Sequence, residues 1–387
     1  MTEQDQLFAE FSPTTKAEWI AKIEKDLKGK PLDELRWQLE ENITLEPFYH
    51  PEDVESAPAP LQGHRQDNNW EIGEYIDVVD IKKANAELLE GLQGGAEAPL
   101  FRLNYPLNAA QLEQLLEGAE LSFISVNFGE YYTDKVPWEL FQHLIALLEK
   151  RGTDKRTVRG SIDFDPLLDW SRPPIDKLAE LIRYCRKDMP LFRPFQVNAH
   201  RFHSGPDASS MELAYTIAKG SEYLARLTGQ GLSAEAINAH MQFSIAISKS
   251  YFVEIAKLRA LRLLWANVTK GYGAPQSPFL AVHFAKETQD DDPNTNMIRA
   301  STQAMSAVIG GTDRLFVLPA NHSHQEPSTA FGRRIARNLQ HLLKMESHLH
   351  RVIDPGAGSY YIEKLTDKLA EQAWEQFQEM EKKGEFS

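Results

Sequence analysis

The chain has 387 residues, enough for one large domain with an extension or for two ordinary domains, and its 42% hydrophobic and 25% charged residues are typical of globular proteins. No stretch approaches 18 consecutive apolar residues, which argues against a membrane span. The formal charge of −14 argues against a general nucleic-acid binder, because phosphates would be repelled. The polar, acidic start MTEQDQLFAEFSPTTKAEW matches neither a signal peptide nor a transit peptide, so we predict a cytoplasmic protein.

The first 65 residues form a predicted N-terminal arm. Residues 1 to about 30 show helical spacing of apolar side chains, at Leu7, Phe8, Phe11, Trp19, Ile20, Ile23 and Leu27. Residues 31–70 are rich in Pro, Glu, Asp and Gln, with isolated apolar anchors at Leu45, Pro47, Phe48 and Tyr49. Such a segment cannot fold alone, so we expect it to be disordered or draped over another surface, such as a partner subunit.

From about residue 70, short apolar runs alternate with longer helical ones. The predicted strands are 74–79, 99–103, 121–127, 158–163, 195–200, 279–284 and 314–318. Helical segments between them include IKKANAELLEGLQGG and PWELFQHLIALLEKRG. Repeated alternation favours parallel βαβ units, and seven strands plus one unrecognised strand would close a (β/α)8 TIM barrel over residues 66–387. An open doubly wound sheet is the alternative; no GxGxxG follows the first strand, which counts mildly against it.

Two stretches of this region carry further expectations. Residues 207–270 interrupt the alternation and read as long helices without an obvious strand between them. Cys185 is the only cysteine, so an internal disulfide and a multi-thiolate metal site are excluded. It lies in the helix-like run LAELIRYCRKD, where we expect a small packed side chain.

Several segments resemble the adenosylcobalamin-dependent acyl-CoA mutases, the methylmalonyl-CoA mutase family. The resemblance covers about residues 65 to 380. The segments that carry it are VNAHRFHSGPDASSMELAYTIAKGSEYL, FVEIAKLRALRLLWA, VIGGTDRLFVLP, GRRIARNLQHLLKMES and RVIDPGAGSYYIEKLTDKLAEQAW. RIARN together with IDP-x-x-GSYY is a specific combination. The resemblance implies a (β/α)8 barrel with the acyl-CoA substrate along its axis, and an adenosyl radical that abstracts hydrogen before the thioester group migrates.

The resemblance also places the family's site residues on this chain. His200 falls at the position of the active-site histidine, but Ala199 stands where an active enzyme has Tyr. Tyr75 falls on the tyrosine of a QYAG-type turn. Two arginine positions have become Asn68 and Gly73, which removes charge that would meet phosphate, and Asp163 replaces a glutamine.

Further differences follow along the chain. The stretch PLLDWSRPP has no counterpart to the family's arginine-bearing segment, and VHFAKETQDDDP is a shortened form of its HCQTSG segment with three consecutive acids. The glutamate that meets the upper face of the cofactor falls at Ser323. No DxHxxG motif, which would supply the cobalt-ligating histidine, occurs in the 387 residues.

This pattern of lost site residues most closely resembles that of the small subunit of the heterodimeric bacterial mutases. The resemblance therefore implies a non-catalytic, structural barrel with no cobalamin-binding domain in this chain. Its partner would be a large catalytic subunit that binds adenosylcobalamin, with self-association as the alternative for the chain purified alone. The second hypothesis is a barrel that binds acyl-CoA and completes its site with a separate cobalamin-binding chain, and the third is a barrel recruited for assembly. Small subunits of the family usually continue into a degenerate second domain, so a shortened chain is also expected.

Each motif has a structural alternative. His200 is a buried structural histidine, a retained ligand contact or a catalytic group, and Tyr75 is a packed ring or a retained family tyrosine. The Glu254, Lys257, Arg259 and Arg262 set reads as a solvated helix face, and the GAGSYY loop as a tight barrel connection. His322 and His324 in ANHSHQ have only Glu326 close by in sequence, which favours a polar loop over a metal site. We predict no metal site.

Overall fold

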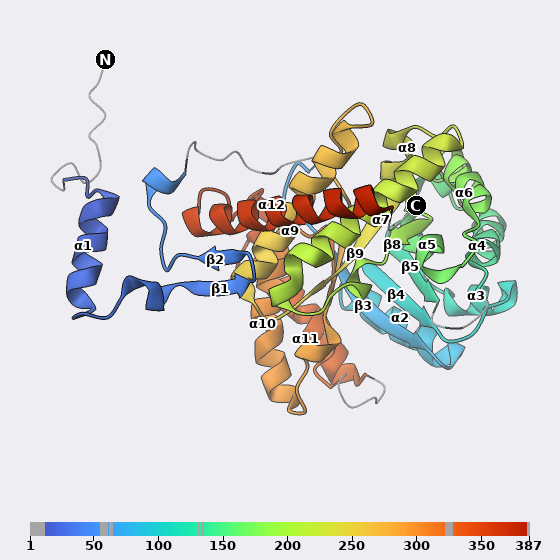
Figure 1. Ribbon diagram of the computed structural model, residues 1–387. Helices are drawn as coiled ribbons and strands as arrows, with labels where there is room; N and C mark the ends of the chain where they lie inside the picture. Colours follow the sequence, from blue (N-terminus) through green and yellow to red (C-terminus); the bar gives the residue numbers. More distant parts are fainter. Residues whose placement is uncertain are drawn as a thin grey trace, which may run out of the picture.

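The computed structural model describes residues 12–54, 61, 65–130, 132, 135–321 and 328–384, and its centre is a parallel barrel (Figure 1). The strand segments are β3 (Glu71–Val78), β4 (Ala98–Leu103), β5 (Ser125–Glu130), β6 (Arg159–Ile162), β7 (Phe192–Arg193), β8 (Phe195–Val197), β9 (Met241–Ile247), β10 (Leu280–Phe284) and β11 (Arg314–Phe316). They are hydrogen-bonded in the order β7-β6-β5-β4-β3-β11-β10-β9-β8. Only Pro194 separates β7 from β8, so these two segments form one strand and the sheet closes with eight. The predicted (β/α)8 barrel is confirmed.

The interruption at Pro194 re-aims the side chains of that strand. Phe192 packs outward against Phe141 of helix α4 (Pro137–Arg151), and Phe195 packs outward against Tyr223 of helix α7 (Ser209–Gly229). The outward faces are therefore three residues apart instead of two. Proline has no N–H to donate to a neighbouring strand, and an extra residue in one strand is a bulge. As a result both Arg193 and Gln196 face the barrel interior, as the hydrogen bond between Gln196 and Gln242 shows for the latter.

Strand β9 is the one that the sequence analysis missed, and the expectation of helices throughout residues 207–270 was wrong there. All seven residues of β9 are buried. Phe243 faces outward against Trp265 of helix α9 (Tyr251–Lys270), whereas Gln242 and Ser244 face inward and form hydrogen bonds in the barrel. Most of the remainder of residues 207–270 is helical, as predicted.

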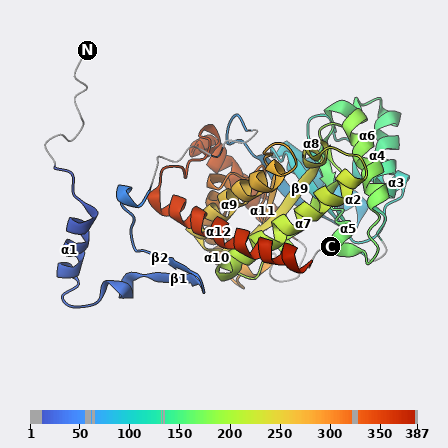
Figure 2. The same cartoon turned by 45° about the horizontal axis from the view of Figure 1, so that its top comes forward.

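Helices surround the barrel. They are α2 (Ile81–Gln93), α3 (Ala109–Leu115), α4 (Pro137–Arg151), α5 (Pro166–Asp169), α6 (Ile175–Asp188), α7 (Ser209–Gly229), α8 (Ala234–Ala239), α9 (Tyr251–Lys270), α10 (Pro293–Ile309), α11 (Ala330–His341) and α12 (Tyr360–Lys383). The long α12 lies across α7 and α9, which places α9 between the sheet and a second layer (Figure 2). Within the described residues, no helix is both long and apolar enough to cross a bilayer. Cys185 on α6 is fully buried, as predicted, and burial raises the pKa of its thiol.

The second layer corrects the interpretation of α9 as a solvated face. Glu254, Lys257, Arg259 and Arg262 are all buried, with between 0% and 6% of each residue exposed. Arg259 binds Asp354 through Nε (2.8 Å) and Glu363 through a terminal nitrogen (2.9 Å). This clamp joins the family segment on α9 to the IDPGAGSYY loop, in which Asp354 (φ 47°) and Gly358 (φ 84°) take left-handed backbone conformations. The two sequence motifs therefore hold each other in place.

The described part of the arm comprises α1 (Lys16–Asp26) and a hairpin of β1 (Trp37–Glu40) and β2 (Ile43–Leu45). Leu39, Ile43 and Leu45 are buried, and the Glu40 carboxylate accepts hydrogen bonds from the backbone N–H (3.0 Å) and hydroxyl of Ser210 at the start of α7. The hairpin is thus draped over this chain's own barrel. Helix α1 has no buried residue and stands apart from the barrel in both views (Figures 1 and 2). The first part of the helix predicted for residues 1 to about 30, residues 1–11, lies outside the described residues.

Candidate active-site barrel

Tyr75 and His200 lie at the C-terminal mouth of the barrel, and His283 lies between them. Tyr75 is on β3, His200 follows β8 and His283 is on β10. The Tyr75 hydroxyl lies 2.7 Å from Nδ1 of His283, and the His200 and His283 ring centres are 6.0 Å apart. Nδ1 of His200 lies 2.9 Å from the Ser244 hydroxyl. The structure therefore brings the two predicted residues to one site, although they do not contact each other directly.

His283 is a residue of this site that the sequence analysis missed. It ends the inward-facing row of β10, and its position near the C-terminal end of a predicted barrel strand was the available signal. Burial, and then the neighbouring His200 and Arg314, lower the pKa of His283 well below its usual value. Burial also lowers the pKa of His200, against the opposing effect of Asp163. Both rings are neutral at pH 7, so the mouth offers hydrogen-bonding groups but no imidazolium charge.

Phe316 of β11 fills the mouth beneath these residues. Its ring stacks on His283 (centroids 4.8 Å apart, interplanar angle 12°) and lies 5.4 Å from the Tyr75 ring. Gly73 faces it from β3. A Cβ atom at Gly73 would lie 2.4 Å from the Leu315 carbonyl oxygen and 2.5 Å from the Phe316 ring, so no larger side chain fits. Gly73 is one of the two positions where the family resemblance implies arginine, and Phe316 closes that position.

The other arginine position, Asn68, is built into the scaffold below the barrel. Its side-chain amide donates to the carbonyl oxygens of Val308 (2.8 Å) and Leu349 (3.0 Å), and its oxygen accepts from Arg65 (2.6 Å). Asn68 is 1% exposed. Its side chain joins separate segments of this chain, which is a structural use of the position.

A row of amides connects the mouth to the lower barrel. Asn198 donates to Asp163 (2.6 Å), Gln196 donates to Asn198 (2.6 Å), and Gln242 donates to Gln196 (2.6 Å). Asp163, which stands at a glutamine position of the family, is thus held by a neighbouring amide. The chain of hydrogen bonds fixes the inward side chains of β6, β8 and β9.

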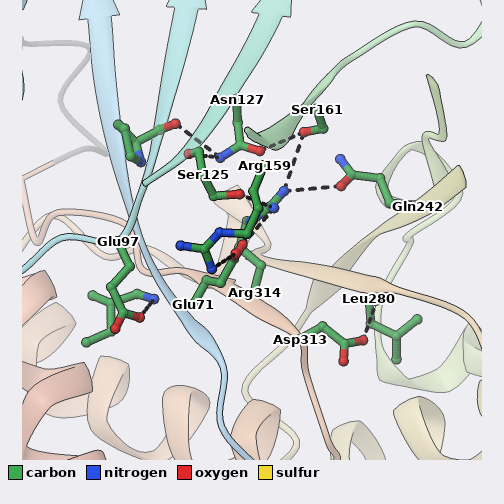
Figure 3. Close-up of polar contacts among 12 residues, drawn as sticks. Glu71, Glu97, Ser125, Asn127, Arg159, Ser161, Gln242, Leu280, Asp313 and Arg314 are labelled. Carbon is green, nitrogen blue, oxygen red and sulfur yellow. Dashed lines mark hydrogen bonds and ion pairs between the residues drawn. The ribbon is translucent and has the colours of Figure 1, made fainter. Parts of the chain in front are cut away.

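Below this row, Arg314 crosses the barrel interior (Figure 3). It rises from β11 and is 1% exposed. Its guanidinium donates to Glu71 (2.7 Å) and to oxygens on three further strands, which belong to Ser125 (2.7 Å), Ser161 (3.4 Å) and Gln242 (3.2 Å). One side chain therefore links five strands at this level, and an extended ligand along the barrel axis would have to displace it.

The remaining predicted site features lie elsewhere. His322, Ser323, His324 and Glu326 are outside the described residues, so the polar-loop interpretation stays a prediction. In the part of the chain that the structure describes, no three His, Cys, Asp or Glu side chains come together as a metal site requires.

A closed parallel (β/α)8 barrel with tyrosine and histidine at its C-terminal mouth defines the class of barrel whose members carry enzyme sites at that end. The methylmalonyl-CoA mutase family model matches residues 108–387, and the chain belongs to that family. The resemblance inferred from the sequence is therefore confirmed.

Three relatives place the chain within the family. It is 35% identical to the methylmalonyl-CoA mutase small subunit of Porphyromonas gingivalis, over 100% of this chain and 66% of that protein. It is 33% identical to the small subunit of Streptomyces virginiae (97% and 65%) and 27% identical to the large subunit of the same organism (98% and 58%). The chain spans about two thirds of the length of the two small subunits.

Adenosylcobalamin is the cofactor of the family, and the resemblance takes its lower cobalt ligand from a DxHxxG motif that does not occur in these 387 residues. At the mouth, Nδ1 of His283 lies beside the Tyr75 hydroxyl and Nδ1 of His200 beside the Ser244 hydroxyl, and the His283 ring stacks on Phe316.

Proposed function

We propose that this chain is the small, non-catalytic subunit of a methylmalonyl-CoA mutase. In the holoenzyme, which interconverts methylmalonyl-CoA and succinyl-CoA, a large subunit binds adenosylcobalamin and acyl-CoA and carries out the chemistry. The names of the two small-subunit relatives and their similarity over nearly the whole of this chain support the assignment.

The observation that carries the proposal is the filled barrel axis. The family's substrate lies along this axis, but here Arg314 binds oxygens from four other strands and Phe316 occupies the space beside Gly73. Pulling one partner out of a buried, hydrogen-bonded charge network costs about 3–5 kcal/mol. An acyl-CoA chain would meet this cost before making any contact of its own.

The arm is the part of the chain that we assign to subunit contacts. Trp19, Leu35 and Trp37 expose 38%, 43% and 44% of their surface. Trp is enriched among the residues that contribute most to binding at interfaces, so these exposed side chains favour the arm as a contact surface. Glu40 of the hairpin anchors the arm on Ser210 of α7, and β2 contacts α12. This role requires that residues 1–65 form an arm and that residues 66–387 form the barrel.

Co-expression with a methylmalonyl-CoA mutase large subunit from the same organism tests the pairing. We expect a stable heterodimer on size-exclusion chromatography, and Trp19→Ala with Trp37→Ala should weaken it by about tenfold or more, because buried aromatic anchors dominate interface energies. Phe123→Ala removes a more exposed aromatic ring (76% exposed) outside the arm and serves as the control. A chain that stays separate from its cognate large subunit would refute the assignment.

The second candidate is a barrel that binds acyl-CoA and completes its site with a separate cobalamin-binding chain. The convergence of Tyr75, His200 and His283 at the mouth favours it. Calorimetry of the purified chain with methylmalonyl-CoA separates the two candidates. We expect no binding at millimolar ligand, and tight binding would favour the second candidate.

A further inference from the structure

Helix α7 begins without a cap from its own sequence. Its N-cap residue is Ala208, whose side chain cannot accept a hydrogen bond, and the N–H groups of a first helical turn have no partners inside the helix. Glu40 of the arm supplies an acceptor. Its carboxylate accepts hydrogen bonds from the backbone N–H of Ser210 (3.0 Å) and from the Ser210 hydroxyl. A negative charge is favoured at this end of a helix, so the arm caps α7 from 170 residues away in the sequence.

The β1–β2 hairpin is shaped to present Glu40 to α7. The pairing of its two strands shifts register between Gln38 and Glu40, which marks a β-bulge. Leu39 is buried and Glu40 is half-buried, so two successive residues of β1 take part in the contact. Ile43 and Leu45 of β2 are also buried. Both ribbon views show the tip of the hairpin beside the start of α7 (Figures 1 and 2).

The segment that leads into α7 is a loop at the barrel mouth, residues 202–208, which we call the mouth loop. It follows His200 of the mouth. Gly205 in this loop has φ 120°, which L side chains rarely adopt. The last part of the loop, the short helix Pro206–Ala208, contacts β1 of the hairpin. The hairpin therefore contacts both the mouth loop and the helix that follows it.

His203 holds the mouth loop from the inner side, and only 2% of its side chain is exposed. Its Nδ1 lies 2.8 Å from a carboxylate oxygen of Glu212, in the first turn of α7. Its Nε2 lies 3.0 Å from Glu287, after β10, at an angle that makes a close polar contact and not a hydrogen bond. Glu212 is in turn fixed by Lys257 of α9 (3.0 Å). The position of His203 thus depends on the first turn of α7, the turn that Glu40 caps.

The same hairpin is connected to the exposed part of the arm. The ring of Trp19 on α1 lies 4.2 Å from the ring of Phe48, three residues after β2. Tyr49, the next residue, lies 5.9 Å from Tyr361 of α12. The contacts therefore run without a break from α1 through the hairpin to the mouth loop.

We propose that the β1–β2 hairpin is a strap that holds the mouth loop in place beside His200, so that displacement of the arm frees this loop. Without Glu40 the first turn of α7 loses its cap, and Glu212 no longer fixes His203. The strap goes beyond the proposed function, in which the arm only contacts the large subunit. It gives the arm a second role, in which movement of the arm changes the access of solvent and ligands to the mouth.

Hydrogen–deuterium exchange of the full chain tests the strap. In Glu40→Ala, peptides that cover residues 199–212 should exchange about tenfold or more faster than in the wild type, because hydrogen bonds to a charged cap are lost. Peptides from β3 and α2 should exchange as before. Glu41→Ala, which removes the exposed neighbouring glutamate, is the matched control. Glu40→Gln keeps one acceptor oxygen and should give a smaller increase.

Labelling of histidines with diethylpyrocarbonate is the second readout. Glu40→Ala should raise the labelling of His203 several-fold, whereas the exposed His348 should be labelled at an unchanged rate. Unchanged exchange of residues 199–212 would overturn the strap. Equal acceleration throughout the chain would also overturn it, because Glu40 would then stabilise the whole fold and not this loop. Should Glu40→Ala fail to fold, Glu40→Gln and Ser210→Ala replace it, since each removes only part of the contact.

Both measurements use the chain without a partner. Their failure would leave the pairing with a large subunit standing, because that pairing is measured by chromatography of the co-expressed chains. The absence of a heterodimer would refute the proposed function and leave the strap standing.

Discussion

The two ends of this barrel use polar side chains in different ways. At the C-terminal mouth, Tyr75, His200 and His283 form hydrogen bonds between neutral groups; Tyr75 is buried, whereas the two histidines are partly exposed. At the N-terminal end, arginines and Glu71 form a charged network in which Arg314 alone reaches four other strands. The mouth retains residues at family positions, whereas at the lower end Arg314 connects strands across the barrel. Because Arg314 and Phe316 fill the barrel axis, a ligand lying along this axis would not reach the residues at the mouth.

The largest expected effect concerns Arg314, which connects strands at the lower end of the barrel. Arg314→Met should lower the free energy of unfolding by about 3 kcal/mol. The substitution leaves Glu71 paired only with Arg159, and it removes the guanidinium N–H groups that donate to Ser125 and Gln242. Urea denaturation measures the change. Arg183→Met on the surface of α6 should stay within about 0.5 kcal/mol. A loss below about 1 kcal/mol would show that the lower barrel does not depend on this charge network.

The next prediction concerns the mouth and restores a family residue there. Ala199→Tyr should destabilise the chain by about 1–3 kcal/mol, since Ala199 is fully buried and a larger side chain must displace its neighbours. It should give no mutase activity with adenosylcobalamin and methylmalonyl-CoA, because Phe316 and Arg314 still fill the axis. Ala199→Ser, which adds one atom, controls for the change of site. Detectable turnover by the tyrosine variant would mean that the lower barrel opens for substrate.

Much of this architecture was predictable because the outward faces of the strands and the helices follow ordinary hydrophobic periodicity. Strand β9 was not, since the polar Gln242 and Ser244 face the barrel interior and the run continues through Ser248, Lys249 and Ser250 directly into α9. In most strands a polar residue indicates a side chain that faces solvent, but in a barrel with a polar interior it can face inward. The local sequence therefore favoured one long helix.

The ion pairs behind the family motifs were unpredictable for a different reason. Arg259 has the spacing of a solvated helix face, but α12 covers it and its partner Glu363 lies 104 residues later in the chain. Tyr75 and His200 could be named from the resemblance, whereas their separation by His283 depends on the barrel register. Pairings of this kind are set by tertiary structure, and a single sequence contains no local signal for them.

The pH dependence of stability distinguishes the neutral mouth from the charged lower end. The pKa of His283 in the folded chain lies well below the value of about 6.5 expected when unfolded, so on acidification the unfolded state takes up a proton first. Stability should therefore be full above about pH 6.5 and fall below it, by up to about 1.4 kcal/mol per pH unit for each such histidine. His283→Gln should flatten this slope between pH 6.5 and 5. His143→Gln on α4 is the comparison, and equal slopes for wild type and His283→Gln would contradict the neutral state of His283.

The smallest expected effect tests the hydrogen bond between Tyr75 and His283. Tyr75→Phe keeps the ring that packs on Phe316 and removes only the hydroxyl, so it should lower the free energy of unfolding by about 1 kcal/mol. Tyr360→Phe, on an exposed ring of α12, should be neutral within about 0.5 kcal/mol. The variant should leave the assembly with the large subunit and the activity of the holoenzyme unchanged, because the proposed role of the mouth is structural. A stability loss with unchanged holoenzyme activity separates this barrel from a catalytic one, in which removing a site hydroxyl lowers the rate by far more than it lowers stability.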